Sequence, residues 1–238
     1  MALPKLKNDR PVYEMVIPST KETVKYRPFL VKEQKSMLVA FESQDMKQIL
    51  NAMLVSIESC VPGININKLA TFDVDYMFTQ LRSKSVGETS TIAYSCAECQ
   101  EQNEIKINLQ DVKMEDKEIK KSLIEINDDI SVQMKFPTYE DMLASNMFSG
   151  ENISATNTLM ESIKSCMHSV QTKDENIILA HEPKEEVETF INSLTNQQLE
   201  KMTEFVEGLP TLEHKLEFEC IKCKHLNKVE LKGLQDFF

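Results

Sequence analysis

Four of the six cysteines in this sequence of 238 residues form two Cys-x-x-Cys pairs, and no other residues in it have clearer chemical potential. The first pair is Cys96 and Cys99, and the second is Cys220 and Cys223. Two thiolates separated by two residues fit one edge of a zinc tetrahedron, so two such pairs supply all four ligands of a closed structural site. Thiolate sulfur selects zinc among the common cellular metals. The spacing therefore predicts one Zn²⁺ held by all four cysteines.

Apolar and polar residues alternate on both sides of each pair, which is typical of two strands joined by a tight turn. The apolar positions are Ile92, Tyr94, Ile105, Ile107 and Leu109 around the first pair, and Leu216, Phe218, Val229 and Leu231 around the second. An Asn lies four residues after the second cysteine of each pair, at Asn103 and Asn227, where it can support the turn. The sequence predicts two β-hairpins with thiols at their tips.

Three other interpretations of the cysteine pairs stay open. A redox-active Cys-x-x-Cys pair normally begins a helix, whereas strand patterns follow both pairs here. The pairs can also be plain thiols without a metal, or each hairpin can share its zinc with a second chain. The remaining cysteines, Cys60 and Cys166, lie on apolar helical faces and are expected to be small buried residues rather than ligands or reactive thiols.

The same order of elements occurs twice along the chain. Two strands, two amphipathic helices, a further helical segment and a Cys-x-x-Cys hairpin are expected in each half. The strands are 13–17 and 23–28, then 123–126 and 130–136; the amphipathic patterns are 33–61, with a break near 43–44, and 138–170, with a break near 149–150; the further helices are 73–82 in the first half, and 185–193 and 195–208 in the second.

This repetition predicts an α+β fold made by tandem duplication, with the two cysteine knuckles joined in a zinc-ribbon-like site. Its parts are a tail at 1–11, a first half at 12–111, a linker at 112–121 and a second half at 122–238. Both amphipathic patterns contain Ser-Ile-x-Ser-Cys, which ends at Cys60 in one half and at Cys166 in the other. One zinc would join the halves through their C-terminal hairpins.

Composition excludes several classes of function. Lys and Arg number 27 against 38 Asp and Glu, so the net charge of −11 disfavours binding to nucleic acid phosphates. No apolar run is long enough to span a membrane, and no glycine-rich phosphate loop or hydrolase motif is present. Zinc with four thiolate ligands has no open position for a substrate or water. The sequence thus predicts a protein that is not an enzyme and has no small-molecule substrate.

Several segments together resemble a known family. They are residues 2–7, the strands within 13–28, the helix ending in Ile-Glu-Ser-Cys60, the segment Phe-Asp-Val-Asp-Tyr-Met-Phe-Thr-Gln-Leu-Arg-Ser-Lys-Ser-Val-Gly at 72–87, and the two knuckles. Over nearly its full length the chain resembles the baseplate hub assembly proteins of T-even-type contractile-tailed bacteriophages. The segment 72–87 is the most specific part of this resemblance.

The resemblance implies a non-enzymatic role in building the central hub of the tail baseplate in the host cytoplasm, with other baseplate or hub proteins as partners. It leaves two alternatives open, retention in the virion tail baseplate and a chaperone role during assembly only. It makes Phe72, Tyr76, Phe78 and Arg82 candidates for partner binding, because aromatic residues and Arg dominate binding hot spots. The alternative is that the apolar residues of this segment pack inward and that Arg82 pairs with an acid.

Two further classes of function stay open. One is a zinc-ribbon adaptor for nucleic acid or transcription machinery, which the basic stretch 222–228 favours and the net charge disfavours. The other is a dithiol oxidoreductase, which a bound zinc would block. Binding to nucleic acid that weakens with salt would favour the first, and a thiol reactive at neutral pH would favour the second.

Overall fold

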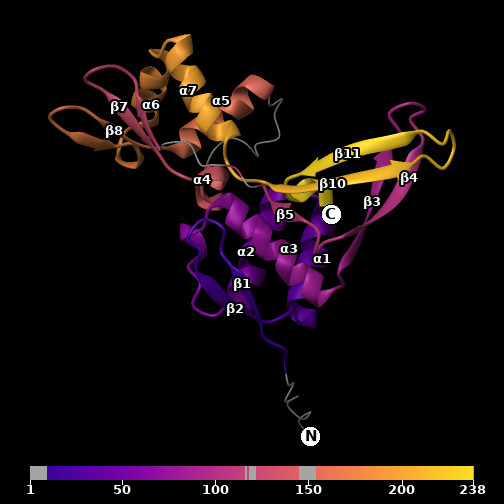
Figure 1. The fold of residues 1–238 in the computed structure, drawn as a ribbon. Helices are drawn as coiled ribbons and strands as arrows, with labels where there is room; N and C mark the ends of the chain where they lie inside the picture. Colours follow the sequence, from indigo (N-terminus) through magenta and orange to yellow (C-terminus); the bar gives the residue numbers. More distant parts are fainter. Residues whose placement is uncertain (1–9, 116, 118–121, 145–153, 238) are drawn as a thin grey trace, which may run out of the picture. The chain divides into compact units, whose positions relative to one another are not determined.

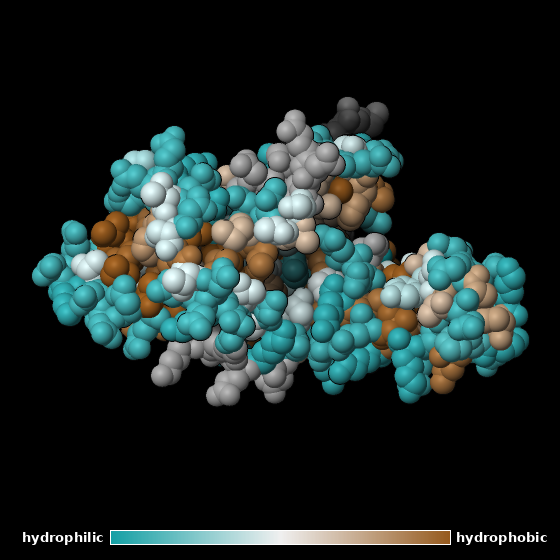
Figure 2. All heavy atoms as spheres, turned by 90° about the horizontal axis from the view of Figure 1, so that it is seen from above, coloured by the Kyte–Doolittle hydropathy of each residue, from teal (hydrophilic) through white to brown (hydrophobic). Residues whose placement is uncertain are grey.

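The structure is a computed structural model that describes residues 10–115, 117, 122–144 and 154–237 (Figure 1). The chain divides into two compact units. Among the described residues, the first unit contains 10–66, 72–115 and 211–237, and the second contains 67–71, 117, 122–144 and 154–210. Helices and small antiparallel sheets occur in both units, so the mixed class of the fold is confirmed. Hydrophilic residues predominate on the face seen in Figure 2.

Two strands and three helices form the N-terminal part of the first unit. They are β1 (Tyr13–Val16), β2 (Thr23–Tyr26), α1 (Val31–Ser43), α2 (Met46–Cys60) and α3 (Thr71–Ser85). Residues 67–71, which include most of a 3₁₀ helix at Ile66–Lys68 and the first residue of α3, belong to the second unit. The helices α1 and α2 are separate because Gln44 adopts a left-handed conformation and Asp45 caps the second helix. Asp73 on α3 is buried and accepts hydrogen bonds from the backbone N–H and the hydroxyl of Ser19 in the turn after β1, at 2.8 and 2.5 Å. These bonds attach α3 to the strand pair.

The two Cys-x-x-Cys segments form β-hairpins in the first unit, as the alternation predicts. The first hairpin is β3 (Thr89–Ser95) with β4 (Gln102–Asn108), and the second is β10 (Leu212–Glu219) with β11 (Leu226–Lys232). The short strand β5 (Lys113–Met114) pairs with β10, and a 3₁₀ helix at Leu234–Phe237 follows β11. Apolar residues of both hairpins share one buried cluster, which consists of Ile92, Ile107, Leu109, Val112, Leu212, Leu231 and Phe237.

The second unit contains a four-stranded antiparallel sheet and four helices. The strands are β6 (Leu123–Glu125), β7 (Ser131–Met134), β8 (Met167–Gln171) and β9 (Asn176–Ile178), in that spatial order. The helices are α4 (Tyr139–Ala144), α5 (Ala155–Cys166), α6 (Lys184–Asn192) and α7 (Asn196–Glu207), with a 3₁₀ helix at Leu179–His181. Fully buried residues of the core come from the sheet and from α5 and α7, namely Val132, Ile163, Cys166 and Met202.

One part of the predicted helix pattern is wrong. The pattern 138–170 was expected to be helical to its end, but α5 stops at Cys166 and residues 167–171 form β8. Met167 and Ser169 are buried while His168 between them is exposed, which is the period of a strand. Strand β8 pairs with β7 and with β9, which the sequence pattern does not predict. The predicted break near 149–150 lies outside the described residues.

The compact units differ from the predicted sequence halves at the C-terminus. The second half was expected to include everything from 122 to 238, yet residues 211–237 lie in the first unit. The physical reason is that the second hairpin shares its apolar cluster and its cysteine cluster with the first hairpin. Units defined by packing and halves defined by repetition are therefore different divisions of this chain.

Matching hydrogen bonds join strand and helix in the two units. The backbone N–H of Arg27, just after β2, donates to the carbonyl of Cys60 at 3.1 Å. The backbone N–H of Lys135, just after β7, donates to the carbonyl of Cys166 at 2.7 Å. In both places the last residue of the second helix element is tied to the residue that follows the second strand. Cysteine, a small apolar residue when its thiol is buried, fits both positions.

The same basic residues also hold the next helix entrance through a carboxylate six positions later. Arg27 pairs with Glu33 at 2.9 Å, and Lys135 pairs with Asp141 at 2.7 Å. Each carboxylate also accepts the backbone N–H three residues before it, at 2.8 and 2.9 Å. Burial by itself raises the pKa of Glu33, but hydrogen bonds from Arg27 and the backbone outweigh burial and hold the pKa below its ordinary value. The pKa of Asp141 is lowered in the same way, by Lys135 and the backbone.

We expect Glu33→Gln to destabilise the protein at neutral pH and to weaken its acid sensitivity. A carboxylate with a lowered pKa in the folded state stabilises the fold above its unfolded pKa of about 4, and this contribution is lost as the pH falls through the folded value. The substitution also leaves the Arg27 guanidinium with a weaker acceptor, at a cost of about 1–3 kcal/mol. Urea unfolding followed by circular dichroism between pH 2 and pH 7 measures both effects.

The matched control is Glu14→Gln. Glu14 pairs with Lys25 at 3.7 Å, but both side chains are exposed, so the expected change is below about 0.5 kcal/mol. Parallel stability curves for the wild type and Glu33→Gln over the acid range would contradict the role assigned to the buried carboxylate.

Candidate metal centre

Each Cys-x-x-Cys pair occupies the turn of its hairpin and is held by backbone hydrogen bonds. In the first turn, the N–H of Cys96 donates to the carbonyl of Glu101 at 2.8 Å, and the N–H of Gln100 donates to the carbonyl of Cys96 at 3.0 Å. Gln100 has a φ of 60°, which reverses the chain directly after the second cysteine. The second turn repeats all three features. The N–H of Cys220 donates to the carbonyl of His225 at 2.9 Å, the N–H of Lys224 donates to the carbonyl of Cys220 at 3.1 Å, and Lys224 has a φ of 59°.

The four sulfur atoms of the two turns lie together. The Sγ atoms of Cys96 and Cys223 are 3.6 Å apart, as are those of Cys99 and Cys220, and all four lie within 4.8 Å of one another. A tetrahedral zinc site with Zn–S bonds of about 2.3 Å has sulfur–sulfur edges of about 3.8 Å. All four thiols are free, so the arrangement differs from a disulfide. The structure thus brings together the four cysteines that the spacing selects, within metal-binding distance.

Asn103 of the first hairpin reaches across to the cysteine turn of the second. Its side-chain oxygen accepts a hydrogen bond from the backbone N–H of Ile221 at 2.9 Å. Its side-chain nitrogen donates to the Sγ of Cys220 at 3.8 Å and to the carbonyl of Glu101 in its own turn at 2.8 Å. The side chain is buried. One amide thus supports its own turn, contacts a cysteine sulfur of the other turn and satisfies a backbone donor there.

Asn227 of the second hairpin makes the reciprocal contacts. Its oxygen accepts from the backbone N–H of Ala97 at 3.0 Å, and its nitrogen donates to the Sγ of Cys96 at 3.5 Å. It also donates to the carbonyl of His225 in its own turn at 3.1 Å. Support of the turn by each Asn is therefore confirmed. The sequence analysis did not predict that each Asn contacts the turn of the opposite hairpin. The equal spacing of the two Asn residues from their cysteine pairs is the one signal of this in the sequence.

The thiols do not ionise alike. Hydrogen bonds, of which the backbone N–H of Cys99 contributes most, lower the pKa of Cys96 to about 6, and the backbone N–H of Cys223 lowers the pKa of Cys220. The N–H of His225 acts in the same direction on Cys223, but desolvation and the neighbouring thiols outweigh it and raise the pKa of Cys223 to about 12. Thiolates crowded together oppose one another's charge, and a bound dication would remove that opposition.

The other two cysteines lie apart from this cluster. Cys60 and Cys166 are fully buried, and burial raises the pKa of the first thiol to about 11 and of the second to about 12. Neither belongs to a metal-binding group among the residues that the structure describes. Protonated, buried thiols of this kind pack as small apolar side chains, as the helical faces predict.

The lysines that flank the second pair are held in ion pairs. Lys222 joins the two hairpins through Glu101 of the first, at 2.7 Å. Lys228 pairs with Glu217 at 2.8 Å, and Lys224 pairs with its neighbour Glu219 at 3.6 Å. These carboxylates offset the basic stretch 222–228 that had favoured nucleic acid as a ligand.

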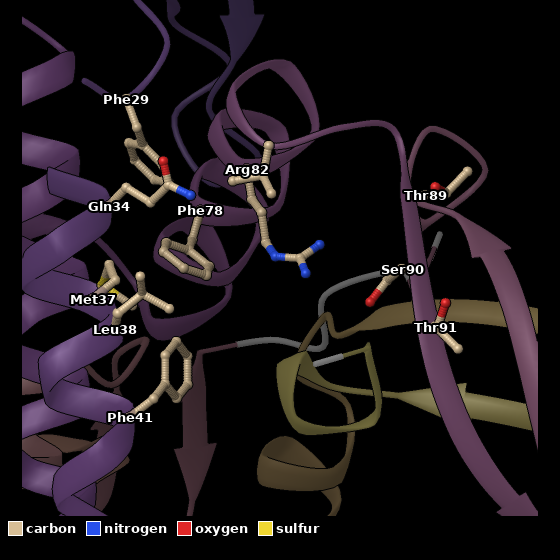
Figure 3. A pocket seen from close by; sticks show the side chains of 11 residues that line it. Phe29, Gln34, Met37, Leu38, Phe41, Phe78, Arg82, Thr89, Ser90 and Thr91 are labelled. Carbon is tan, nitrogen blue, oxygen red and sulfur yellow. The ribbon is translucent and has the colours of Figure 1, made fainter. Parts of the chain in front are cut away.

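The candidate partner-binding residues on α3 have different surroundings. Phe72 and Phe78 are only 4% and 3% exposed, so neither ring presents an open surface. Tyr76 is half-buried and packs against the apolar cluster of the hairpins. Arg82 is half-buried and lines a pocket together with Phe78 (Figure 3). An aromatic surface over the whole segment is thus not present, and only its C-terminal end borders an accessible site.

The family model described as T4 bacteriophage base plate protein matches residues 10–238. The chain belongs to this family. The resemblance noted in the sequence is therefore confirmed at the level of a T4-type baseplate protein. Comparisons with curated proteins and with solved structures gave no match. Within the described parts of this baseplate protein, none of the helices has the length and apolar character needed to cross a membrane.

Proposed function

We propose that this chain is a non-enzymatic structural or assembly protein of the central hub of a contractile-tail baseplate, with one Zn²⁺ joining its two cysteine hairpins. The observation that carries the baseplate role is the family match, which covers residues 10–238. Membership of a baseplate family favours a role in contacts between tail proteins. The hub, as the place of this role within the baseplate, comes from the sequence resemblance.

The donor set supports a structural zinc. Four thiolate ligands close the coordination sphere, so the ion stabilises the fold and offers no position at which to activate water. The reciprocal contacts of Asn103 and Asn227 orient ligand sulfurs in the manner of outer-shell groups in metal sites. The same closed site accounts for the expected absence of catalysis and of a small-molecule substrate.

A tandem duplication accounts for the repeated details of the chain. The pairs Arg27–Glu33 and Lys135–Asp141 have the same spacing and bind the same kind of helix entrance. The two cysteine turns have the same backbone hydrogen bonds, and each has a residue in the left-handed conformation directly after its second cysteine. In this proposal the halves are 12–111 and 122–238, joined by the linker 112–121 and preceded by the tail 1–11, and the zinc unites their last hairpins.

The proposed partners are other baseplate or hub proteins. The chain binds them in the host cytoplasm during assembly and stays with them in the tail baseplate. Nucleic acid is disfavoured by the net charge of −11 and by the ion pairs of Lys222, Lys224 and Lys228. A membrane is not expected to be a partner either.

Co-purification from phage-infected cells tests this role. We expect the full-length tagged protein to bring down other tail baseplate proteins, identified by mass spectrometry, in a complex that withstands nuclease treatment. Cells infected with phage that lack the protein should accumulate incomplete tails. Recovery of nucleic acid alone, in amounts that fall with added salt, or of no partner at all would contradict the proposal.

A further inference from the structure

A pocket of about 410 Å³ lies in the first unit beside α1, α3 and the start of β3. Its apolar lining consists of Phe29, Met37, Leu38, Phe41, Phe78 and Val86. Arg82 follows Phe78 by one turn of α3, and Figure 3 shows its guanidinium pointing away from the phenyl rings toward Ser90 on β3. We call this site the Arg82 pocket. The other lining residues, Gln34, Thr89, Ser90 and Thr91, are polar and uncharged. An apolar lining with a few polar groups is typical of a binding site that fixes the orientation of its ligand.

The apolar wall is open on the α1 side. Leu38 and Phe41 are 56% and 44% exposed, although both line the pocket. Together with Gln34 and Met37 they occupy positions i, i+3, i+4 and i+7, which form one stripe along a helix. A stripe of this kind beside a groove is how proteins receive the apolar face of another helix. Phe29 and Phe78 form the floor of the pocket, and their ring centroids are 6.0 Å apart.

Charge identifies the kind of ligand. Among the described residues that line the pocket, Arg82 alone is charged, in a chain whose net charge is −11. Burial lowers the pKa of Arg82, yet an arginine side chain stays charged at neutral pH. A guanidinium has five N–H donors in a fixed fork, so it can donate hydrogen bonds to an incoming carboxylate while keeping its contacts within the protein. A carboxylate next to an apolar segment complements both sides of this pocket.

A second copy of the chain fits less well than a different protein. In a symmetric dimer the same patch meets itself, so two pockets facing each other would bring two Arg82 side chains together away from water. Like charges brought together in this way oppose binding.

We infer that the Arg82 pocket receives an amphipathic helix of another baseplate protein, with the apolar side chains of that helix on Leu38 and Phe41 and an Asp or Glu of the helix paired with Arg82. Phe29 and Phe78 support this contact from the floor of the pocket. The inference rests on the proposed baseplate role. Of the four candidate partner-binding residues it retains Arg82 as a contact and Phe78 as part of the pocket floor, and it adds the exposed residues of α1, which the sequence analysis did not select.

Site-specific photo-crosslinking in infected cells tests this directly. The full-length protein carries p-benzoylphenylalanine at Leu38 or, as the matched control, at Val55, which is 51% exposed on α2 and does not line the pocket. We expect the Leu38 position to link to one tail protein, at least tenfold more than the Val55 position. The linked peptide should have apolar residues at helical spacing and an Asp or Glu beside them.

Charge reversal then tests the pairing. Arg82→Glu should reduce the Leu38 crosslink at least tenfold, and Arg82→Lys should retain part of it. Changing the Asp or Glu of the linked peptide to Lys should restore the crosslink to Arg82→Glu, a rescue that a misfolded variant does not give. Circular dichroism and thermal unfolding check that Arg82→Glu folds, and Leu38→Asp, on the exposed wall, provides a second variant with the same expected loss.

Each other outcome overturns the inference. These outcomes are a crosslink to a second copy of this chain, to nucleic acid or to lipid, a linked peptide without a carboxylate, equal yields at Leu38 and Val55, no crosslink, or no rescue by charge reversal. If the wild type and the pocket variants bring down the same tail proteins equally, the pocket fails while the baseplate role stands. If the wild type brings down no tail protein, the baseplate role itself fails.

Discussion

Cys220→Ser is expected to abolish stoichiometric zinc binding and to separate the tips of the two hairpins. Cys220 is fully buried, its sulfur lies 3.6 Å from that of Cys99, and Asn103 holds it from the other hairpin. Outer-shell changes alone weaken metal sites about 10–100-fold, so loss of a ligand should weaken zinc binding by more than about 100-fold. A metal held by all four cysteines would link two turns with 120 residues between them, so its binding free energy would also stabilise the fold.

The effect on stability should be large but less than in an isolated zinc peptide. Zinc binding supplies about 10–16 kcal/mol in small zinc-finger peptides, which have almost no other core. Here the hairpins also share the cluster around Ile92, Leu231 and Phe237, which persists without the metal. Each kcal/mol lost should lower the Tm by about 2–4 °C in a protein of this size. A chelator should lower the Tm of the wild type and leave that of Cys220→Ser unchanged.

Native mass spectrometry of the purified protein, without chelator, measures the stoichiometry. We expect one zinc on the wild-type monomer, none on Cys220→Ser, and one on Cys60→Ala, the control that removes a buried thiol outside the cluster. A metal-free wild type whose mass is lowered by disulfide formation would favour a dithiol oxidoreductase. A dimer with two zincs would mean that the hairpins are exchanged between chains.

Asn103→Ala and Asn227→Ala are expected to weaken zinc binding about 10–100-fold each, although neither residue is a ligand. Each substitution removes a donor to a buried sulfur and leaves a backbone N–H, that of Ile221 or of Ala97, without its acceptor. Loss of a partner for a buried polar group costs about 1–3 kcal/mol of stability. Asn→Asp at either position should be worse, because a carboxylate cannot donate to a thiolate and repels its charge.

The two amides should also be coupled. The side chains of Asn103 and Asn227 join the same pair of turns. Loss of one allows the turns to move apart and reduces the contribution of the other to stability and zinc affinity. We expect the double variant to lose less than the sum of the single variants, with an interaction energy of about 0.5–3 kcal/mol. Competition with a chromophoric chelator measures zinc affinity, and urea unfolding measures stability. The control is Asn108→Ala, whose side chain bonds only the exposed turn after β4; effects equal to this control would refute the role of the crossed amides.

Much of the site was predictable because its information is local. The Cys-x-x-Cys spacing selects a ligand pair within four residues, and the alternation around Ile107 and Leu231 specifies strands on either side. The break between α1 and α2 was predictable for the same reason, because Gln44 and Asp45 end one helix and begin the next. Convergence of the two pairs followed from chemistry, since one tetrahedral metal needs four sulfurs.

The candidate ligand set, the hairpins that carry it and most of the helices were therefore predictable from the sequence. Only the tertiary structure decided that residues 211–237 pack with the first unit, that 167–171 form a strand, and that each Asn crosses to the opposite turn. It also decided which end of α3 borders a pocket, because α1 and β3 supply the other walls. The reason is physical: spacing and periodicity act between near neighbours, whereas these features depend on segments that meet only after the chain has folded.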